Sequence, residues 1–138
     1  MSRELPRERI AKAIYDASIL MLIYDGVDVF GDVSELLGSE PECIVPKSVL
    51  AELERIAAGE GWKKTRAARL ALEVVARRRC KVIDTGDSRG DEAIITLALT
   101  LRDAIPVTAD NELRRRLREK GIPNIYYRRS RHKLMLEY

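Results

Sequence analysis

Apolar and polar residues follow two periods along the chain, which predict strands and helices in regular succession. Short apolar or β-branched runs, typical of buried strands, occur at 11–16, 42–46, 80–84, 104–110 and 122–129. Apolar residues at helical spacing, or on nearly every side, predict helices at 28–37, 47–58, 64–79, 91–102 and 111–121. The apolar segment 17–24 fits a buried helix or a continuation of the first strand. Alternating strands and helices predict a three-layer α/β/α sandwich around a central parallel sheet.

The length of 138 residues suits one domain, 1–138, with an N-terminal extension at 1–10 and a basic C-terminal tail at 128–138. Charged residues make up 34% of the chain and Gln is absent, a pattern typical of proteins that work at high temperature. We expect Cys43 and Cys80 to be buried, reduced thiols, with a disulfide as the less favoured alternative. The N-terminus lacks the apolar stretch of a signal peptide, and no run is long enough to span a membrane, so we expect a cytoplasmic protein.

Basic residues gather at the C-terminal end of the chain. The formal net charge is only +3, but residues 111–138 contain nine Lys or Arg against three acids. Three of these arginines, Arg114, Arg115 and Arg118, lie on the helix predicted at 111–121, where they could contact RNA phosphates. A solvated helix face explains the same pattern equally well.

Four carboxylates recur where the predicted strands end and the following helices begin. They are Asp16, Glu52, Asp91 and Asp110. Each alone could be a helix cap or a solvated residue. Ligands of open parallel sheets lie at the carboxyl ends of the strands, so the topology would bring all four together. Like charges that converge need a compensating cation, and Mg²⁺ or Mn²⁺ prefers oxygen ligands of this kind. Such a cluster predicts metal-dependent hydrolysis of phosphodiester bonds.

Four segments that carry these acids resemble the motifs of PIN-domain nucleases, and they occur in the family's order. They are IYDASILML, VPKSVLAELERIA, GDEAIITLAL and VTADNELRRRLREKGIPNIYY. The resemblance covers nearly the whole chain beyond residue 10. It implies a PIN-like fold and a Mg²⁺- or Mn²⁺-dependent endoribonuclease whose catalytic, metal-binding acids are Asp16, Glu52, Asp91 and Asp110. It also implies that Ser18, Thr108 and Glu92 support these ligands, and it leaves open whether Glu92 or Glu54 contacts the metal.

The first motif reads Asp-Ala-Ser where Asp-Thr-Asn is common in the family, a variant with which we expect activity to survive. The segments after GDEAI look most like the branch that contains the small-subunit processome nuclease, with VapC-type toxins next. The resemblance therefore implies RNA as substrate, possible rRNA processing, and a possible homodimer. Two alternatives stay open: a non-catalytic RNA-binding factor among ribosome-assembly factors, and a toxin ribonuclease that pairs with an antitoxin protein.

Overall fold

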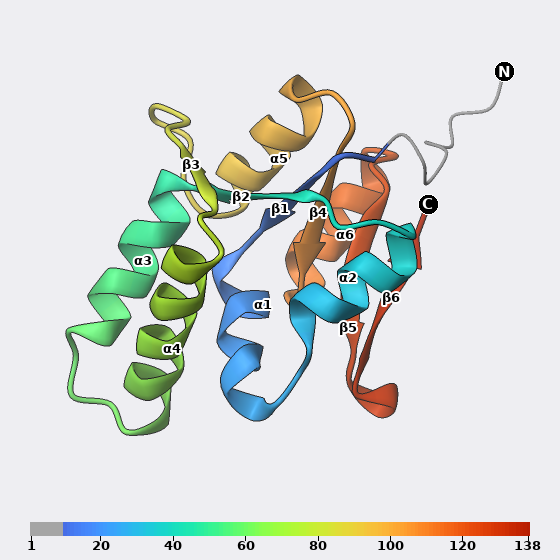
Figure 1. The fold of residues 1–138 in the computed structure, drawn as a ribbon. Coiled ribbons are helices and arrows are strands. Elements are labelled where there is room, and N and C mark those ends of the chain that lie inside the picture. Colours follow the sequence, from blue (N-terminus) through green and yellow to red (C-terminus); the bar gives the residue numbers. More distant parts are fainter. Residues whose placement is uncertain (1–9) are drawn as a thin grey trace, which may run out of the picture.

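A six-stranded sheet runs through the centre of the computed structural model, which describes residues 10–138 (Figure 1). The strands are β1 (Lys12–Tyr15), β2 (Glu42–Pro46), β3 (Lys81–Ile83), β4 (Ala104–Thr108), β5 (Asn124–Arg128) and β6 (Lys133–Glu137). Their order in the sheet is β3-β2-β1-β4-β5-β6. Strands β1 to β5 pair in parallel, and β6 pairs antiparallel with β5.

Helices cover both faces of this sheet (Figure 1). They are α1 (Ala17–Met21), η2 (Leu22–Asp25), α2 (Val29–Leu37), α3 (Lys47–Ala57), α4 (Lys63–Arg77), α5 (Asp91–Thr100), α6 (Asn111–Glu119) and η3 (Arg129–Arg131). Helices α5 and α6 pack on one face against β1, β4 and β5, and the first four α-helices lie on the other. The three-layer α/β/α architecture predicted from the sequence is confirmed.

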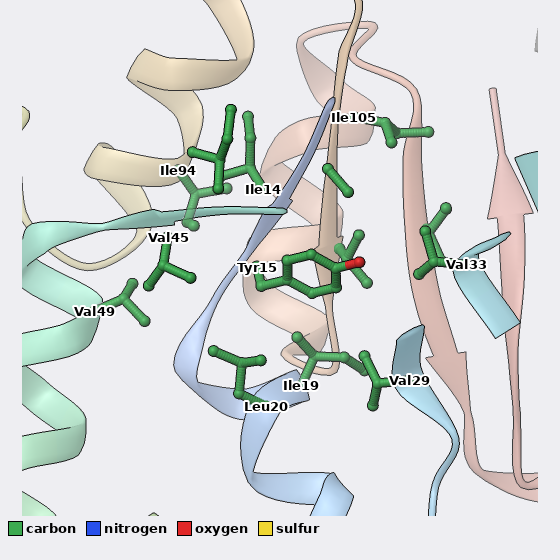
Figure 2. Packing of buried hydrophobic residues seen from close by; sticks show 14 of the residues in the cluster. Ile14, Tyr15, Ile19, Leu20, Val29, Val33, Val45, Val49, Ile94 and Ile105 are labelled. Atoms are coloured by element: carbon green, nitrogen blue, oxygen red, sulfur yellow. The ribbon is translucent and has the colours of Figure 1, made fainter. Parts of the chain in front are cut away.

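Strand β1 lies in the middle of the core, because it pairs with β2 on one side and β4 on the other. Its side chains alternate between the two faces of the sheet. Figure 2 shows Ile14 beside Ile94 of α5, while the ring of Tyr15 lies 4.8 Å from the ring of Phe30 in α2. Burial of Ile14 and Tyr15 to 1% exposure or less fixes β1 in place, so that the residue following it has a defined position.

The register of the central strands brings two predicted site residues together. Tyr15 pairs with Val107, and the backbone N–H of Asp16 donates to the carbonyl of Val107 at 3.3 Å. Both strands therefore end at the same level, with Asp16 after β1 and Asp110 shortly after β4. The switch point of the sheet lies between β1 and β4, because the chain builds the sheet from β1 through β2 to β3 on one side and continues with β4 on the other.

Two expectations from the sequence are wrong. The segment 128–138 is not a tail: after the short η3 turn, β6 forms the edge strand of the sheet, and its Leu134 is fully buried. Cys43 and Cys80 are not reduced thiols but form a disulfide that joins the start of β2 to the residue before β3.

The predicted extension at 1–10 lies outside the described residues except for Ile10, which is buried. Among the helices of residues 10–138, none has the length and apolar character needed to cross a membrane.

Candidate carboxylate active site

Asp16 is the best-fixed residue of the candidate site. It caps the N-terminus of α1, where its Oδ1 accepts the backbone N–H of Ile19 at 3.0 Å. The Ser18 hydroxyl donates to its two carboxylate oxygens at 2.8 and 2.9 Å, and the Thr108 hydroxyl donates to Oδ2 at 2.5 Å. The Asp16 side chain is thus held by donors from α1 and from β4, at 7% exposure.

Ser18 and Thr108 also tie Asp16 to the chain around Asp110. The backbone N–H of Ala109 donates to the Ser18 hydroxyl at 3.0 Å, and the backbone N–H of Asp110 donates to the Thr108 hydroxyl at 2.9 Å. Both hydroxyls therefore accept from one segment while they donate to the Asp16 carboxylate. This arrangement places Ser18 and Thr108 where they orient the Asp16 carboxylate, and their predicted role in supporting a metal ligand stays a prediction.

Asp110 caps the next helix in the same way. Its Oδ1 accepts the backbone N–H groups of Glu112 and Leu113 at 2.8 and 3.2 Å, at the N-terminus of α6. Within residues 10–138, its Oδ2 has no hydrogen-bond or ion-pair partner. The helix cap therefore fixes the carboxylate and leaves one oxygen free for a ligand.

The electrostatics of Asp16 favour a cation nearby. Burial raises the pKa of its carboxyl to about 6, and the charge of Asp110 adds to that rise. Hydrogen bonds from Thr108, Ile19 and Ser18 work in the opposite direction, because they stabilise the ionised form. A buried carboxylate that faces a second carboxylate gains most from a cation that offsets both charges.

Asp91, the first residue of α5, interacts electrostatically with Asp110. Partial burial raises its pKa, the charge of Asp110 raises it further, and Arg116 of α6 opposes both effects. The Arg116 guanidinium lies 3.7 Å from the Asp91 carboxylate and forms a hydrogen-bonded ion pair with Glu92. Glu92 is exposed, and its contact is with this arginine. The structure therefore places Glu92 on the outer surface beside Asp91.

Glu52 lies in a separate part of the site. It is half-buried on α3 and lines a pocket of about 480 Å³ together with Lys47, Arg55 and the loop 84–90 that precedes Asp91. Asp16, Asp91 and Asp110 do not line this pocket. Among residues 10–138, no three His, Cys, Asp or Glu side chains are arranged closely enough to hold a metal ion. The structure thus brings Asp16, Asp110 and Asp91 into electrostatic contact and leaves Glu52 at the margin.

The three arginines predicted to bind RNA are engaged within the protein. Arg114 forms a two-pronged ion pair with Glu137 of β6, and Arg118 lies 3.9 Å from the same carboxylate. Arg115 pairs with Glu112 and Glu119 on its own helix. Each of these positive charges is therefore at least partly offset by a carboxylate.

Sequence reasoning missed the role of Arg116 and the carboxylate that holds Arg114. Arg116 belongs to the basic run on α6, but its link to Asp91 and Glu92 crosses from α6 to α5 and needs the packing of the two helices. Glu137 lies in the segment that was expected to be a tail. The one available signal was the short apolar run Leu-Met-Leu between Lys133 and Glu137, which fits a strand.

Comparisons with known proteins show the family of this chain. Residues 13–130 match the model of a family described as "PIN like domain", so the chain belongs to that family. It is 32% identical over 116 residues to Ribonuclease VapC9 of Archaeoglobus fulgidus, covering 83% of this chain and 82% of the relative. It is 24% identical over 122 residues to Ribonuclease VapC4 of Methanocaldococcus jannaschii, covering 88% and 93%.

Its fold is similar to the solved structure of the PIN domain endonuclease Utp24, with a TM-score of 0.74 at 22% identity. The match covers 95% of this chain and 94% of that one. The PIN-domain resemblance seen in the sequence is confirmed. The two sequence relatives are named VapC ribonucleases, and the likeness to Utp24 shows the fold.

Proposed function

We propose that this protein is a divalent-metal-dependent endoribonuclease that hydrolyses RNA phosphodiester bonds at the Asp16–Asp110 edge of the sheet. The observation that carries the proposal is the pair of carboxylates fixed at the ends of β1 and β4, one of them buried with a raised pKa. Two relatives that match more than four-fifths of the chain are named ribonucleases, which supports RNA as the substrate.

The residues present fit a Mg²⁺ or Mn²⁺ ion. The side-chain atoms of Asp16, Thr108 and Asp110 that could ligate a metal are carboxylate and hydroxyl oxygens, the type that these cations prefer. Oδ2 of Asp110 is free to bind. Mg²⁺ commonly binds through one or two carboxylates and completes its coordination with water and substrate phosphate, so three preassembled protein ligands are not required. When bound, such an ion supplies charge neutralisation and Lewis acidity for the attack of water on the phosphodiester.

The chain's own residues have distinct roles in this proposal. Asp16 and Asp110 hold the cation, while Ser18 and Thr108 keep the Asp16 carboxylate in one orientation. Asp91 completes the acid cluster from the start of α5. Glu52 acts from the neighbouring pocket, where it helps to position the substrate or the attacking water.

A second candidate within the same activity is a toxin ribonuclease held by an antitoxin protein. The 32% identity to Ribonuclease VapC9 favours it over a role in rRNA processing, because the likeness to Utp24 at 22% identity concerns the fold. Co-purification of a small partner after expression in the native host would support it. A cytoplasmic location and a homodimer stay part of the proposal. If the protein cuts no RNA, we would instead assign it as a non-catalytic RNA-binding assembly factor.

The proposal is tested with labelled structured RNA, wild-type protein and an Asp16→Asn variant, each with Mn²⁺ or with EDTA. We expect cleavage by the wild type with Mn²⁺, no cleavage with EDTA, and loss of cleavage in the variant. Circular dichroism of the variant checks that it folds. If wild-type protein binds RNA and does not cut it with any divalent metal, the enzyme assignment is wrong and the assembly-factor alternative takes its place.

A further inference from the structure

A pocket of about 350 Å³ lies on the face of the sheet that α2 and α4 cover, at the amino end of β2. Its walls come from α2, the loop that follows α2, the start of β2 and the end of α4. None of the four predicted metal-binding acids lines it. The pocket is therefore separate from the carboxylate edge, and its volume is at the lower end of the range for small-molecule sites.

Tyr15 contributes a buried phenol to this pocket. The residue is 1% exposed, and Figure 2 shows its ring extending from β1 toward α2. Within residues 10–138, its hydroxyl has no hydrogen-bond partner. Buried Tyr hydroxyls usually have one, because an unpaired polar group in the interior costs free energy. A polar group bound in the pocket would supply the missing partner.

The Tyr15 hydroxyl is a hydrogen-bond donor at neutral pH. Burial raises its pKa above the usual value, the positive charge of Arg78 opposes this rise, and the charge of Glu40 adds to it. The phenol therefore keeps its proton and can donate to an oxygen atom of a ligand.

Arg78 gives the pocket a flat cationic wall. Its guanidinium lies 4.2 Å above the centre of the Phe30 ring, and its Nη1 donates to a carboxylate oxygen of Glu40 at 3.0 Å. The ring and the carboxylate together hold the guanidinium in one plane. The Arg78 side chain is still 41% exposed, so a second flat group has room to pack against it.

The carboxylates around the pocket offset one arginine and no more. Glu40 is paired with Arg78. Glu42 also borders the pocket, and it pairs in register with Lys12 of β1. Side chains alternate along a strand, so Lys12 and Tyr15 point to opposite faces of the sheet. The Glu42 side chain therefore lies on the other face, away from the pocket.

Arg79 supplies a second guanidinium that the protein does not neutralise. It is exposed, and its side chain forms no ion pair or hydrogen bond within residues 10–138. It follows α4 in the left-handed conformation, with a φ of 51°, at the position where helices favour Gly. A side chain there costs conformational energy, and no contact among the described residues offsets that cost. An anion paired with the guanidinium would do so.

We propose that this pocket binds a small aromatic carboxylate. The carboxylate accepts hydrogen bonds from Arg79 and from the Tyr15 hydroxyl, and the ring packs against the Arg78 guanidinium. The inference assigns a second site on the protein and does not depend on the proposed nuclease activity.

The charge and size of the pocket favour a carboxylate over a phosphate. One unpaired guanidinium matches a single negative charge, whereas a phosphate monoester carries nearly two at neutral pH. The guanidinium fork fits the two oxygens of a carboxylate, and guanidinium planes stack on aromatic rings. The small volume suits one or two rings and excludes a folded peptide or a nucleic acid strand.

Binding is measured by proton–nitrogen correlation NMR of the isotope-labelled full chain, in EDTA and without RNA. The probe is naphthoate. Its neutral amide tests the charge, cyclohexanecarboxylate tests the aromatic ring, and adenosine monophosphate tests the phosphate alternative. We expect naphthoate to shift the backbone amides of Ser34, Cys43 and Arg79, which line the pocket, and to leave those of Ser18 and Asp110 unchanged.

Two variants remove the proposed contacts without removing any contact of the free protein. Arg79→Gly should lower the affinity for naphthoate at least about tenfold, and Tyr15→Phe about three- to tenfold. Gly suits the left-handed conformation, and Phe lacks only the unpaired hydroxyl, so neither variant should lower the melting temperature. The matched control is Arg131→Ala, which removes an exposed, unpaired charge on the turn before β6 and should keep the wild-type affinity.

Several results would overturn the inference. Equal binding of naphthoate and its amide, or of naphthoate and cyclohexanecarboxylate, would show that the site does not select an aromatic anion. Tighter binding of adenosine monophosphate would assign the site to a phosphate. Equal losses in Arg79→Gly and Arg131→Ala would show general charge attraction. If naphthoate shifts none of the three pocket amides up to its solubility limit, the pocket holds water only.

Discussion

Asp16 and Asp110 are placed by the ends of two neighbouring central strands, whereas Glu52 and Asp91 sit on helices that follow a strand or a loop at the side of the sheet. The first pair, here called the inner pair, is joined by the hydrogen bonds of Ser18 and Thr108. The second pair, the outer pair, has no such link: Glu52 lines the pocket formed by α3 and the loop 84–90, and Asp91 begins the helix that follows this loop. Side chains at the ends of hydrogen-bonded strands keep their geometry without a ligand. The positions of side chains on the outer helices depend more on the metal or RNA that binds there.

This difference predicts unequal effects when one acid of each pair is neutralised, and it is the largest effect we expect. Asp110→Asn should lower the rate of RNA cleavage by more than about 100-fold, because an inner ligand is lost. Asn is as good an N-cap as Asp, so α6 and the melting temperature should change little. Glu52→Gln should lower the rate by less than about tenfold. Initial rates with Mn²⁺ measure both, and a larger loss in Glu52→Gln would reverse the ranking.

A disulfide links β2 to the residue before β3, on the side of the sheet away from β4. The disulfide between Cys43 and Cys80 spans 37 residues and lies at the sheet edge opposite the carboxylates. Its removal in Cys43→Ser/Cys80→Ser should reduce the free energy of unfolding by about 3–4 kcal/mol, through the greater entropy of the unfolded chain. Cleavage at moderate temperature should remain.

Denaturant unfolding with and without a reducing agent provides the measurement. The reducing agent should destabilise the wild type and leave the double variant unchanged. An equal unfolding free energy for oxidised and reduced wild type would show that the disulfide does not stabilise the fold.

Thr108 tests the link within the inner pair. Thr108→Val keeps the shape of this fully buried side chain but removes the hydroxyl that donates to Asp16 and accepts from the Asp110 backbone. Cleavage should fall by about 10- to 100-fold, in the range found for residues that orient metal ligands. Thr108→Ser restores the hydroxyl and should recover most of the activity. If Val and Ser variants behave alike in the cleavage assay, the hydroxyl does not orient Asp16.

The smallest effect is expected at Arg116, which links α6 to the outer pair. Its ion pairs with Asp91 and Glu92 are partly exposed to solvent, so Arg116→Ala should lower the free energy of unfolding only slightly. Because a positive charge near Asp91 competes with a cation, the variant should bind Mn²⁺ about threefold more tightly. Calorimetric titration measures this, with Arg115→Ala as a control that should leave Mn²⁺ affinity unchanged. Weaker Mn²⁺ binding in Arg116→Ala would contradict the competition.

The sequence predicted most of the fold, since periodic patterns in single elements are local information. Helix 28–37 with its Asp28 cap and strand 42–46 were found as they stand in the structure, and 17–24 was resolved as α1 and η2. Strand β6 was missed because its five residues follow a run of basic residues and a turn at His132. The disulfide was missed because its formation depends on how β2 and the end of α4 approach each other, which no local pattern encodes.

The candidate site divides in the same way. Strand ends at Asp16 and Asp110 could be located from the sequence, and parallel pairing then places them at one edge. The Arg114–Glu137 pair and the Arg116–Asp91 contact join segments that are far apart in the chain. The sequence alone therefore could not predict that carboxylates of the protein pair with these arginines. The metal-binding roles of Asp16, Glu52, Asp91 and Asp110 stay predictions.

The central claim is that the inner pair binds the catalytic cation, and a crystal structure of the wild type soaked in Mn²⁺ tests it most directly. Anomalous scattering locates the ion without reference to the expected site. We predict a peak about 2.0–2.2 Å from carboxylate oxygens of Asp16 and Asp110, with Glu52 farther away. A peak bound by Glu52 and remote from Asp16, or no peak at this edge at Mn²⁺ concentrations that support cleavage, would contradict the account.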